Sequence, residues 1–288
     1  MDHLIKNSNL VPDLKFGDTN VSSLLYADDV VLLNSCPKSL QEALNKVDIS
    51  CRQAGMKISP SKTKVMKIGR ESANLNFKLN DVKIEQVSQF TYLGTIFNEN
   101  GRLDTEIDSR ISKAGSVGSQ LNRFIWNKKE VSQKTKLAVY NSVFNPILTY
   151  GSESWVRNKE IDRRLETADM RVVRKIGGIN RWHQWQDRIS NEDIRKRLDI
   201  VSVQEKVSKS NLRWYGHVNR MGEHRLAKQI FEAKMDGKRP RGRPRGRWMD
   251  GVKIALESRG LTKDKARHLT SNRNTWRKIA DRKLVLKN

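Results

Sequence analysis

The stretch VSSLLYADDVVLL, residues 21–33, decides how the first part of this chain folds. Apolar and β-branched residues flank Asp28-Asp29, so the pattern predicts two short strands joined by a tight turn. Adjacent carboxylates at a hairpin tip repel each other, and Mg²⁺, which prefers oxygen ligands, would compensate them. Aspartate is also common in solvated turns, which is the simpler interpretation of an isolated Asp-Asp pair.

One helix and several further strands follow this hairpin. Apolar residues spaced three or four apart from Leu40 to Ala54 predict a helix that begins at Pro37 and ends at Gly55. Strands are predicted at residues 64–68, 77–79, 82–84 and 90–97, with Asn80-Asp81 as a hairpin turn. The first part of the chain, residues 11–97, therefore predicts an α+β fold.

The pattern becomes helical after Gly101. Helices are predicted at residues 107–125, 136–144, 161–176 and 201–221 and within 249–283, with breaks at Pro146 and Gly177-Gly178. The large tryptophan side chains are expected to pack between these helices at positions 126, 155, 214, 248 and 276. For Trp182 and Trp185 packing and stacking on nucleic-acid bases both stay open.

Positive charge is concentrated toward the C-terminus. The 288 residues include 56 Lys+Arg and 32 Asp+Glu, a net charge of +24. Residues 1–100 carry a net charge of +1, whereas residues 201–288 hold 24 basic and 8 acidic residues, a net charge of +16. Such an excess favours a polyanionic partner, RNA or DNA, because each neutralised phosphate releases counterions. The alternative is a solvated, highly charged helical surface.

The most basic segment is GKRPRGRPRGR, residues 237–247, which cannot form a packed element. Its core, PRGRP, resembles an AT-hook, in which Arg-Gly-Arg lies in a narrow A·T minor groove. A flexible basic linker is an equally good interpretation. Either interpretation predicts salt-dependent nucleic-acid binding by the basic tail residues, which are Lys238, Arg239, Arg241, Arg243, Arg245 and Arg247.

Composition argues against several other classes of protein. No apolar run reaches the roughly 18 residues that a membrane span needs, and the start of the chain lacks a signal-peptide apolar region. Cys36 and Cys51 are too few for a disulfide framework, and no Cys/His cluster suggests zinc. We therefore expect an intracellular protein with reduced thiols and no membrane contact, in the nucleus rather than the cytoplasm.

Several segments, in order over roughly residues 20–250, resemble the reverse transcriptases of non-LTR (LINE-like) retrotransposons. Tyr26-Ala27-Asp28-Asp29 resembles the palm signature and residues 90–94 the primer-grip strand. Residues 55–64 resemble the next family motif, which usually has Asn where this chain has Ser59. The other matching segments are residues 40–45, 150–155, 212–218 and 242–245.

The resemblance implies roles for particular residues. Asp28 would be a catalytic metal ligand and Asp29 its auxiliary partner, with Mg²⁺ as the cofactor. Lys62 would lie near the phosphates of an incoming deoxynucleotide, beside Tyr26 of the signature. Tyr92, Leu93 and Gly94 would hold the primer end.

The resemblance also implies a division of the chain. Residues 1–100 would be the C-terminal part of a palm, a short antiparallel sheet plus a helix, and residues 101–180 a helical thumb or connection. Residues 181–236 would form a helical C-terminal region. Residues 237–247 would be a basic AT-hook-like linker, and residues 248–288 a helical basic tail.

The family's first catalytic aspartate sits on an earlier palm strand, and neither Asp13 nor Asp18 resembles its motif. Because a two-metal site needs carboxylates from both strands, the Mg²⁺ site is expected to be incomplete. We therefore expect an N-terminally truncated RNA-directed DNA polymerase, a nucleotidyltransferase by resemblance. It is expected to be inactive alone, to use deoxynucleotides only if the missing palm were supplied, and to retain nucleic-acid binding. The alternative is a non-enzymatic DNA- or RNA-binding protein derived from a transposon.

Overall fold

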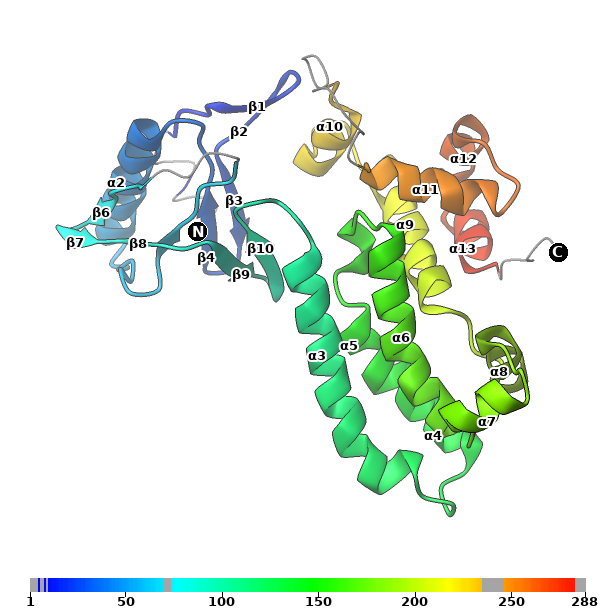
Figure 1. Cartoon of the computed structure of the whole chain (residues 1–288). Helices are drawn as coiled ribbons and strands as arrows, with labels where there is room; N and C mark the ends of the chain where they lie inside the picture. Colours follow the sequence, from blue (N-terminus) through cyan, green and yellow to red (C-terminus); the bar gives the residue numbers. More distant parts are fainter. Residues whose placement is uncertain (1–4, 6–7, 9, 70–73, 235–245, 283–288) are drawn as a thin grey trace. The chain divides into compact units, whose positions relative to one another are not determined.

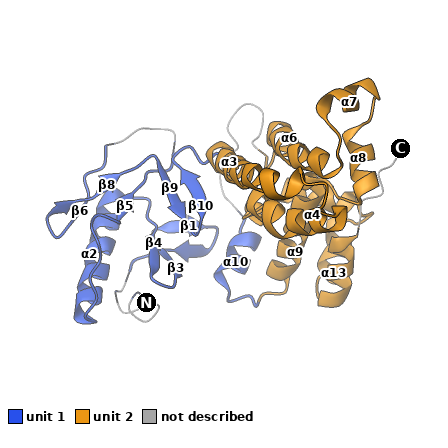
Figure 2. Ribbon diagram, turned by 90° about the horizontal axis from the view of Figure 1, so that it is seen from below, with its two compact units in different colours: residues 1–102, 222–241 blue, residues 103–221, 242–288 orange. Residues whose placement is uncertain are grey.

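The computed structural model describes residues 5, 8, 10–69, 74–234 and 246–282 (Figure 1). Two compact units share the chain (Figure 2). The first unit contains residues 1–102 and 222–241, and the second contains residues 103–221 and 242–288. Strand pairs lie in the first unit and most helices in the second, which confirms an α+β fold.

Short antiparallel hairpins make up most of the first unit. The pairs are β1 (Leu14–Phe16) with β2 (Thr19–Val21), β3 (Ser23–Tyr26) with β4 (Asp29–Leu32), β6 (Lys78–Leu79) with β7 (Val82–Lys83), and β9 (Gln89–Tyr92) with β10 (Thr95–Asn98). A parallel pair joins β5 (Lys64–Val65) to β8 (Glu85–Gln86). The hairpins predicted around Asp28 and around Asn80-Asp81 are confirmed.

Each hairpin closes with a two-residue turn that begins in the left-handed region. The first turn residues have φ of 58° at Gly17, 52° at Ala27, 52° at Asn80 and 49° at Leu93. A positive φ at this position is what the mirror-image turns require, because their twist matches that of the flanking strands. Three of the four residues carry a Cβ, so these turns are strained locally and held by their strands.

The prediction of one continuous strand over residues 90–97 is wrong. Leu93 and Gly94 both have positive φ, so the chain reverses there and β9 pairs with β10 through Tyr92 and Thr95. The apolar run hides this reversal because both strands of the hairpin are rich in aromatic and β-branched residues. Gly94 was the local signal for a turn.

Helix α2 (Pro37–Gln53) carries the core of the first unit. Val47 and Cys51 are buried together with the apolar side chains of the β3–β4 hairpin, Leu25, Val30 and Leu32. Leu40 and Leu44, one helical turn earlier, pack against a second cluster around Leu79 and Ile84. The predicted helix and its end at Gly55, whose φ is 71°, are confirmed. The unit also includes α10 (Leu226–Glu232).

Helices form the second unit, and α3 (Asp104–Leu121) and α6 (Lys159–Ile176) lie side by side in it (Figure 1). The other α-helices are α4 (Gln133–Val139), α5 (Asn145–Leu148), α7 (Arg181–Gln186), α8 (Asn191–Leu198), α9 (Val203–Asn219), α11 (Trp248–Glu257), α12 (Lys263–Leu269) and α13 (Arg273–Asp281). Two π-helical segments, Asn122–Trp126 and Tyr140–Phe144, and a 3-10 turn at Ser152–Ser154 complete the unit.

The predicted break at Pro146 does not occur. Residues 133–148 form one continuous helical run, in which the π-helical segment Tyr140–Phe144 directly precedes α5. Proline is tolerated in the first turn of a helix, and a π-helical turn changes the hydrogen-bond pattern before it. The predicted break at Gly177-Gly178 is confirmed by the end of α6 at Ile176.

Three tryptophans anchor the helical packing. Trp126, Trp155 and Trp276 are each no more than 2% exposed. The indole of Trp126 donates to the Gly118 carbonyl at 3.0 Å, and that of Trp276 donates to the Leu212 carbonyl at 2.8 Å. The packing expected for these three side chains is confirmed.

Because α9 packs closely against α13, we expect a single methyl group added at their contact to change the stability of the fold. A Cβ at Gly216 would overlap the buried indole of Trp276. We therefore expect Gly216→Ala to lower the free energy of unfolding by about 1–3 kcal/mol through overpacking. Gly115→Ala in α3, where a Cβ has open space, is the control and should stabilise by about 0.5–1 kcal/mol. Urea unfolding of both variants checks this, and equal effects would contradict it.

Candidate functional site

The hairpin of β3 and β4 presents the two predicted catalytic carboxylates at its tip. Asp28 is the second turn residue, and Asp29 opens β4 opposite Tyr26 in the strand register. All three side chains are exposed, Tyr26 by 62%. Leu25 and Val30, on the other face of the hairpin, pack against the cluster around α2 and hold the tip in place.

The second predicted element, the β9–β10 hairpin, lies near the first. Tyr92 ends β9, and Leu93 and Gly94 form the turn. Burial raises the pKa of the Tyr92 hydroxyl, and the negative charge of Asp29 raises it further. The structure therefore brings Tyr92 and Asp29 within electrostatic reach of each other. Leu93 is 40% exposed, so the turn faces solvent.

Lys62 lies in the turn that connects α2 to β5. The Thr63 hydroxyl closes this turn by donating to the Ser59 carbonyl at 2.8 Å. The Lys62 side chain is exposed, and no ion pair or hydrogen bond joins it to Asp28, Asp29 or any other residue in the described part of the chain. Its predicted role near a nucleotide therefore stays a prediction.

The donor set at the hairpin does not fit a two-metal polymerase centre. Mg²⁺ is held octahedrally by oxygen ligands, and two such ions need bridging carboxylates from more than one strand. Asp28 and Asp29 lie side by side on one exposed hairpin. In the described ranges no three His, Cys, Asp or Glu side chains gather in a way that could hold a metal ion.

The predicted basic tail falls mostly outside the described residues. Lys238, Arg239, Arg241, Arg243 and Arg245 lie in the range 235–245, which the structure does not describe. Arg247 is described and exposed, and its backbone N–H donates to Asp250 at 2.7 Å. The next residue, Trp248, donates its indole N–H to the Glu153 carbonyl at 2.6 Å and so fixes the chain directly after the tail.

A buried polar network lies in the helical unit, where sequence reasoning placed no site. The Lys206 ammonium donates to the Tyr140 hydroxyl at 2.5 Å, and that hydroxyl donates to Asp169 at 2.6 Å. The Arg195 guanidinium binds Asp169 and also Glu166, both at 2.8 Å. The network joins α6, α8 and α9, and its members lie far apart in sequence, beyond what helical periodicity can pair.

Burial shifts the pKa of two members of this network. It lowers the pKa of Lys206 to about 8, against the pull of Asp169. It also raises the pKa of Tyr140 well above its usual range, with Asp169 adding to the effect. Both shifts favour the neutral forms, as expected where charge leaves water.

The first part of the chain, which contains both hairpins, is similar to a known protein family. Residues 1–97 match the family model described as reverse transcriptase (RNA-dependent DNA polymerase). This part of the chain is thus similar in sequence to reverse transcriptases. No solved structure matches the chain.

Two relatives connect the chain to transposons. An uncharacterized transposon-derived protein of Caenorhabditis elegans is 27% identical over 252 residues, which cover 85% of this chain and 89% of that protein. The retrovirus-related Pol polyprotein from the type-1 retrotransposable element R2 of Nasonia vitripennis is 25% identical over 103 residues. That match covers 32% of this chain and 10% of the polyprotein. The chain is thus similar to a transposon-derived protein over most of its length and to a retrotransposon polyprotein over about a third of it.

No helix among the described residues is long and apolar enough to span a membrane.

The low pKa of Lys206 predicts how stability depends on pH. Between about pH 8 and the ordinary lysine value of 10.5, the folded side chain has released a proton that the unfolded chain still holds. Unfolding therefore takes up a proton, and the free energy of unfolding should rise with pH in this window, by up to about 1.4 kcal/mol per pH unit.

Urea unfolding from pH 7 to about 9.5, below the range where free tyrosine ionises, measures this slope. Lys206→Met keeps the packing of the stem without a titrating group, so the additional rise should disappear in that variant. Identical slopes in both proteins would show that Lys206 is charged throughout this range.

Proposed function

We propose that this chain is a nucleic-acid-binding protein derived from a retrotransposon reverse transcriptase, and that the polypeptide alone does not copy a template. The charge distribution carries this proposal, because residues 201–288 have a net charge of +16 while the reverse-transcriptase-like part is nearly neutral. Phosphate binding by such a surface gives largely sequence-independent affinity. The proposed partners are RNA and DNA, and the proposed location is the nucleus.

The polymerase roles stay proposals that rest on the family resemblance. Asp28 and Asp29 would be the metal ligands, Tyr26 and Lys62 would face the nucleotide, and the turn at Tyr92, Leu93 and Gly94 would face the primer. The exposed two-carboxylate tip supports the absence of activity, because it supplies too few oxygens for two Mg²⁺ ions. Residues 1–100 would be palm-derived, 101–180 a thumb or connection, and 181–236 a C-terminal helical region.

Removal of charge from the basic tail distinguishes binding by that segment from binding by net charge alone. We expect replacement of its six cations by glutamine to weaken duplex DNA binding. The slope of log Kd against log salt should fall by up to about 0.9 for each DNA phosphate that the variant no longer neutralises. The positions replaced are Lys238, Arg239, Arg241, Arg243, Arg245 and Arg247. Fluorescence anisotropy across a salt series gives both quantities.

A matched control removes the same charge from the first unit. Six exposed lysines of that unit are changed to glutamine, at positions 15, 38, 46, 57, 78 and 83. The tail variant should lose more affinity than this control. Equal losses would show that only net charge matters, and a preference of the intact chain for A·T-rich duplex would identify hook-like binding rather than a linker.

A further inference from the structure

An open groove of about 970 Å³ lies between α6 and the segment from α7 to the start of α8, within the helical unit. Its volume is at the upper end of the range for ligand sites, and it is open to solvent rather than enclosed. Its most prominent lining residues are four arginines, Arg171, Arg174, Arg181 and Arg188, and one tryptophan, Trp185.

The arginines of the groove have no carboxylate partners in the part of the chain that the structure describes. None of the four forms a salt bridge there, and Arg174 donates only to Gln184, at 3.3 Å. The one carboxylate that lines the groove, Glu166, is already bound by Arg195 at 2.8 Å. Asp187, Glu192 and Asp193 do not line it. Glu166 also attracts Arg174 electrostatically, so four arginines share one lining carboxylate that is already bound to Arg195. The remaining excess of positive charge suits an anion.

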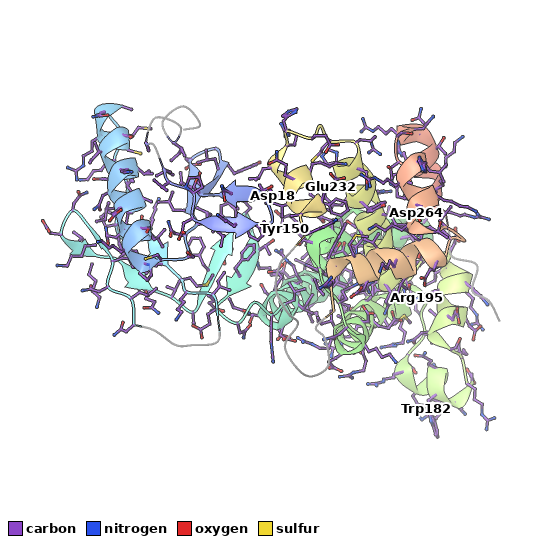
Figure 3. The ribbon with its side chains drawn as sticks, turned by 90° about the horizontal axis from the view of Figure 1, so that it is seen from above. Asp18, Tyr150, Trp182, Arg195, Glu232 and Asp264 are labelled. Atoms are coloured by element: carbon purple, nitrogen blue, oxygen red, sulfur yellow. The ribbon has the colours of Figure 1, made fainter. Side chains whose placement is uncertain are left out.

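Two tryptophans beside these arginines face water. Trp185 is 79% exposed and Trp182 is 60% exposed, whereas Trp126, Trp155 and Trp276 are buried. Figure 3 shows Trp182 on α7 with its side chain pointing away from the helical unit. A tryptophan buries a large apolar area when it packs, so two exposed indoles on one six-residue helix leave a large stacking surface in water.

Ion pairs and hydrogen bonds among α6, α7 and α8 hold the groove in shape. Arg195 ties α8 to α6 through Asp169 and Glu166. The Gln184 side chain donates to Asn191 at 2.9 Å and accepts from Arg174, which connects α7 to α8 and α6. The Asn180 side chain caps α7 by accepting the His183 N–H at 2.7 Å. The arginines and tryptophans therefore lie on a preformed surface.

We propose that this groove binds a single strand of nucleic acid, with phosphates on the four arginines and a base stacked on Trp185, which lines the groove. A further base would stack on Trp182, which lies on the same helix outside the groove lining. The inference deepens the proposed nucleic-acid binding and rests on it. Alternating cations and exposed aromatic rings suit a single strand, because its bases are free to stack on indole faces while its backbone follows the charged groove. A duplex hides its base faces and would use only the arginines.

The test measures anisotropy of a short fluorescein-labelled single strand of mixed sequence and of the matching duplex, each with the intact chain. Trp182→Ala/Trp185→Ala should weaken single-strand binding by at least about fivefold for each indole that stacks. Duplex binding should change by less than the single-strand value. Trp182→Phe/Trp185→Phe keeps aromatic faces and should recover most of the affinity. Since both indoles are exposed, thermal unfolding of these variants should match that of the intact chain.

A second variant and its control measure how much the groove arginines contribute to single-strand binding. Arg174→Gln/Arg188→Gln should reduce the single-strand salt slope by about 0.7 for each phosphate that these arginines neutralise in the intact chain. Arg163→Gln removes a charge from the same helix α6, but Arg163 is exposed and already paired with Glu160 at 2.7 Å, so the slope should stay unchanged. Phe124→Ala, which removes a 67% exposed ring outside the groove, is the aromatic control.

The outcomes distinguish failure of the groove inference from failure of the proposed function. Failure of the intact chain to bind any strand or duplex at low salt would overturn the proposed function. Binding that the tryptophan changes leave intact, or reduce equally for strand and duplex, would overturn the groove inference alone. Polyglutamate bound as tightly as the oligonucleotide, with the same dependence on tryptophan, would show that the groove takes an acidic polypeptide instead.

Discussion

Three buried carboxylates of the helical unit are each paired with a buried arginine, and two of these pairs join different helical segments. Glu106 binds Arg110 at 2.5 Å within α3, Asp169 binds Arg195 at 2.8 Å between α6 and α8, and Glu205 binds Arg259 at 2.8 Å between α9 and the end of α11. Burial raises the pKa of Glu205 and lowers that of Arg259, so the attraction within that pair does not fully repay desolvation. Such pairs contribute little net stability, but removal of one partner would leave an uncompensated buried charge.

This pairing links the fold to the proposed function. The chain has 56 basic but only 32 acidic residues. Several acidic residues of the helical unit are buried in its interior. Other arginines, such as Arg171, Arg181 and Arg188, form no ion pair with an acidic residue among the described residues, and they line the groove. In the proposed function a polyanion would supply the counter-charge that the chain does not, and binding would then depend strongly on salt.

Local features of the fold were predictable from the sequence, whereas contacts between distant segments were not. The β3–β4 and β6–β7 hairpins, α2 and the end of α6 follow from periodicity, turn residues and glycine. The turn at Leu93 was missed because a bulky residue seldom adopts positive φ. The helical run through Pro146 depends on a π-helical segment that no sequence pattern predicts. The groove arginines and the Asp169–Arg195 pair meet only through tertiary packing, and sequence reasoning placed no site there. The site predicted from sequence and resemblance comprises the hairpin carboxylates, the nucleotide and primer residues 26, 62 and 92–94, and the basic tail.

The proposal that the chain binds nucleic acid without copying it can be tested by primer extension. Extension by the intact chain is measured beside binding of the same labelled template–primer. Asp28 and Asp29 on one exposed hairpin supply too few ligands for two Mg²⁺ ions, while the cationic helical unit has excess positive charge for phosphates. We expect the chain to bind the template–primer at low salt and, with Mg²⁺ and deoxynucleotides present, to yield no extended product above background. Extension by the intact chain that disappears in Asp28→Ala would contradict it.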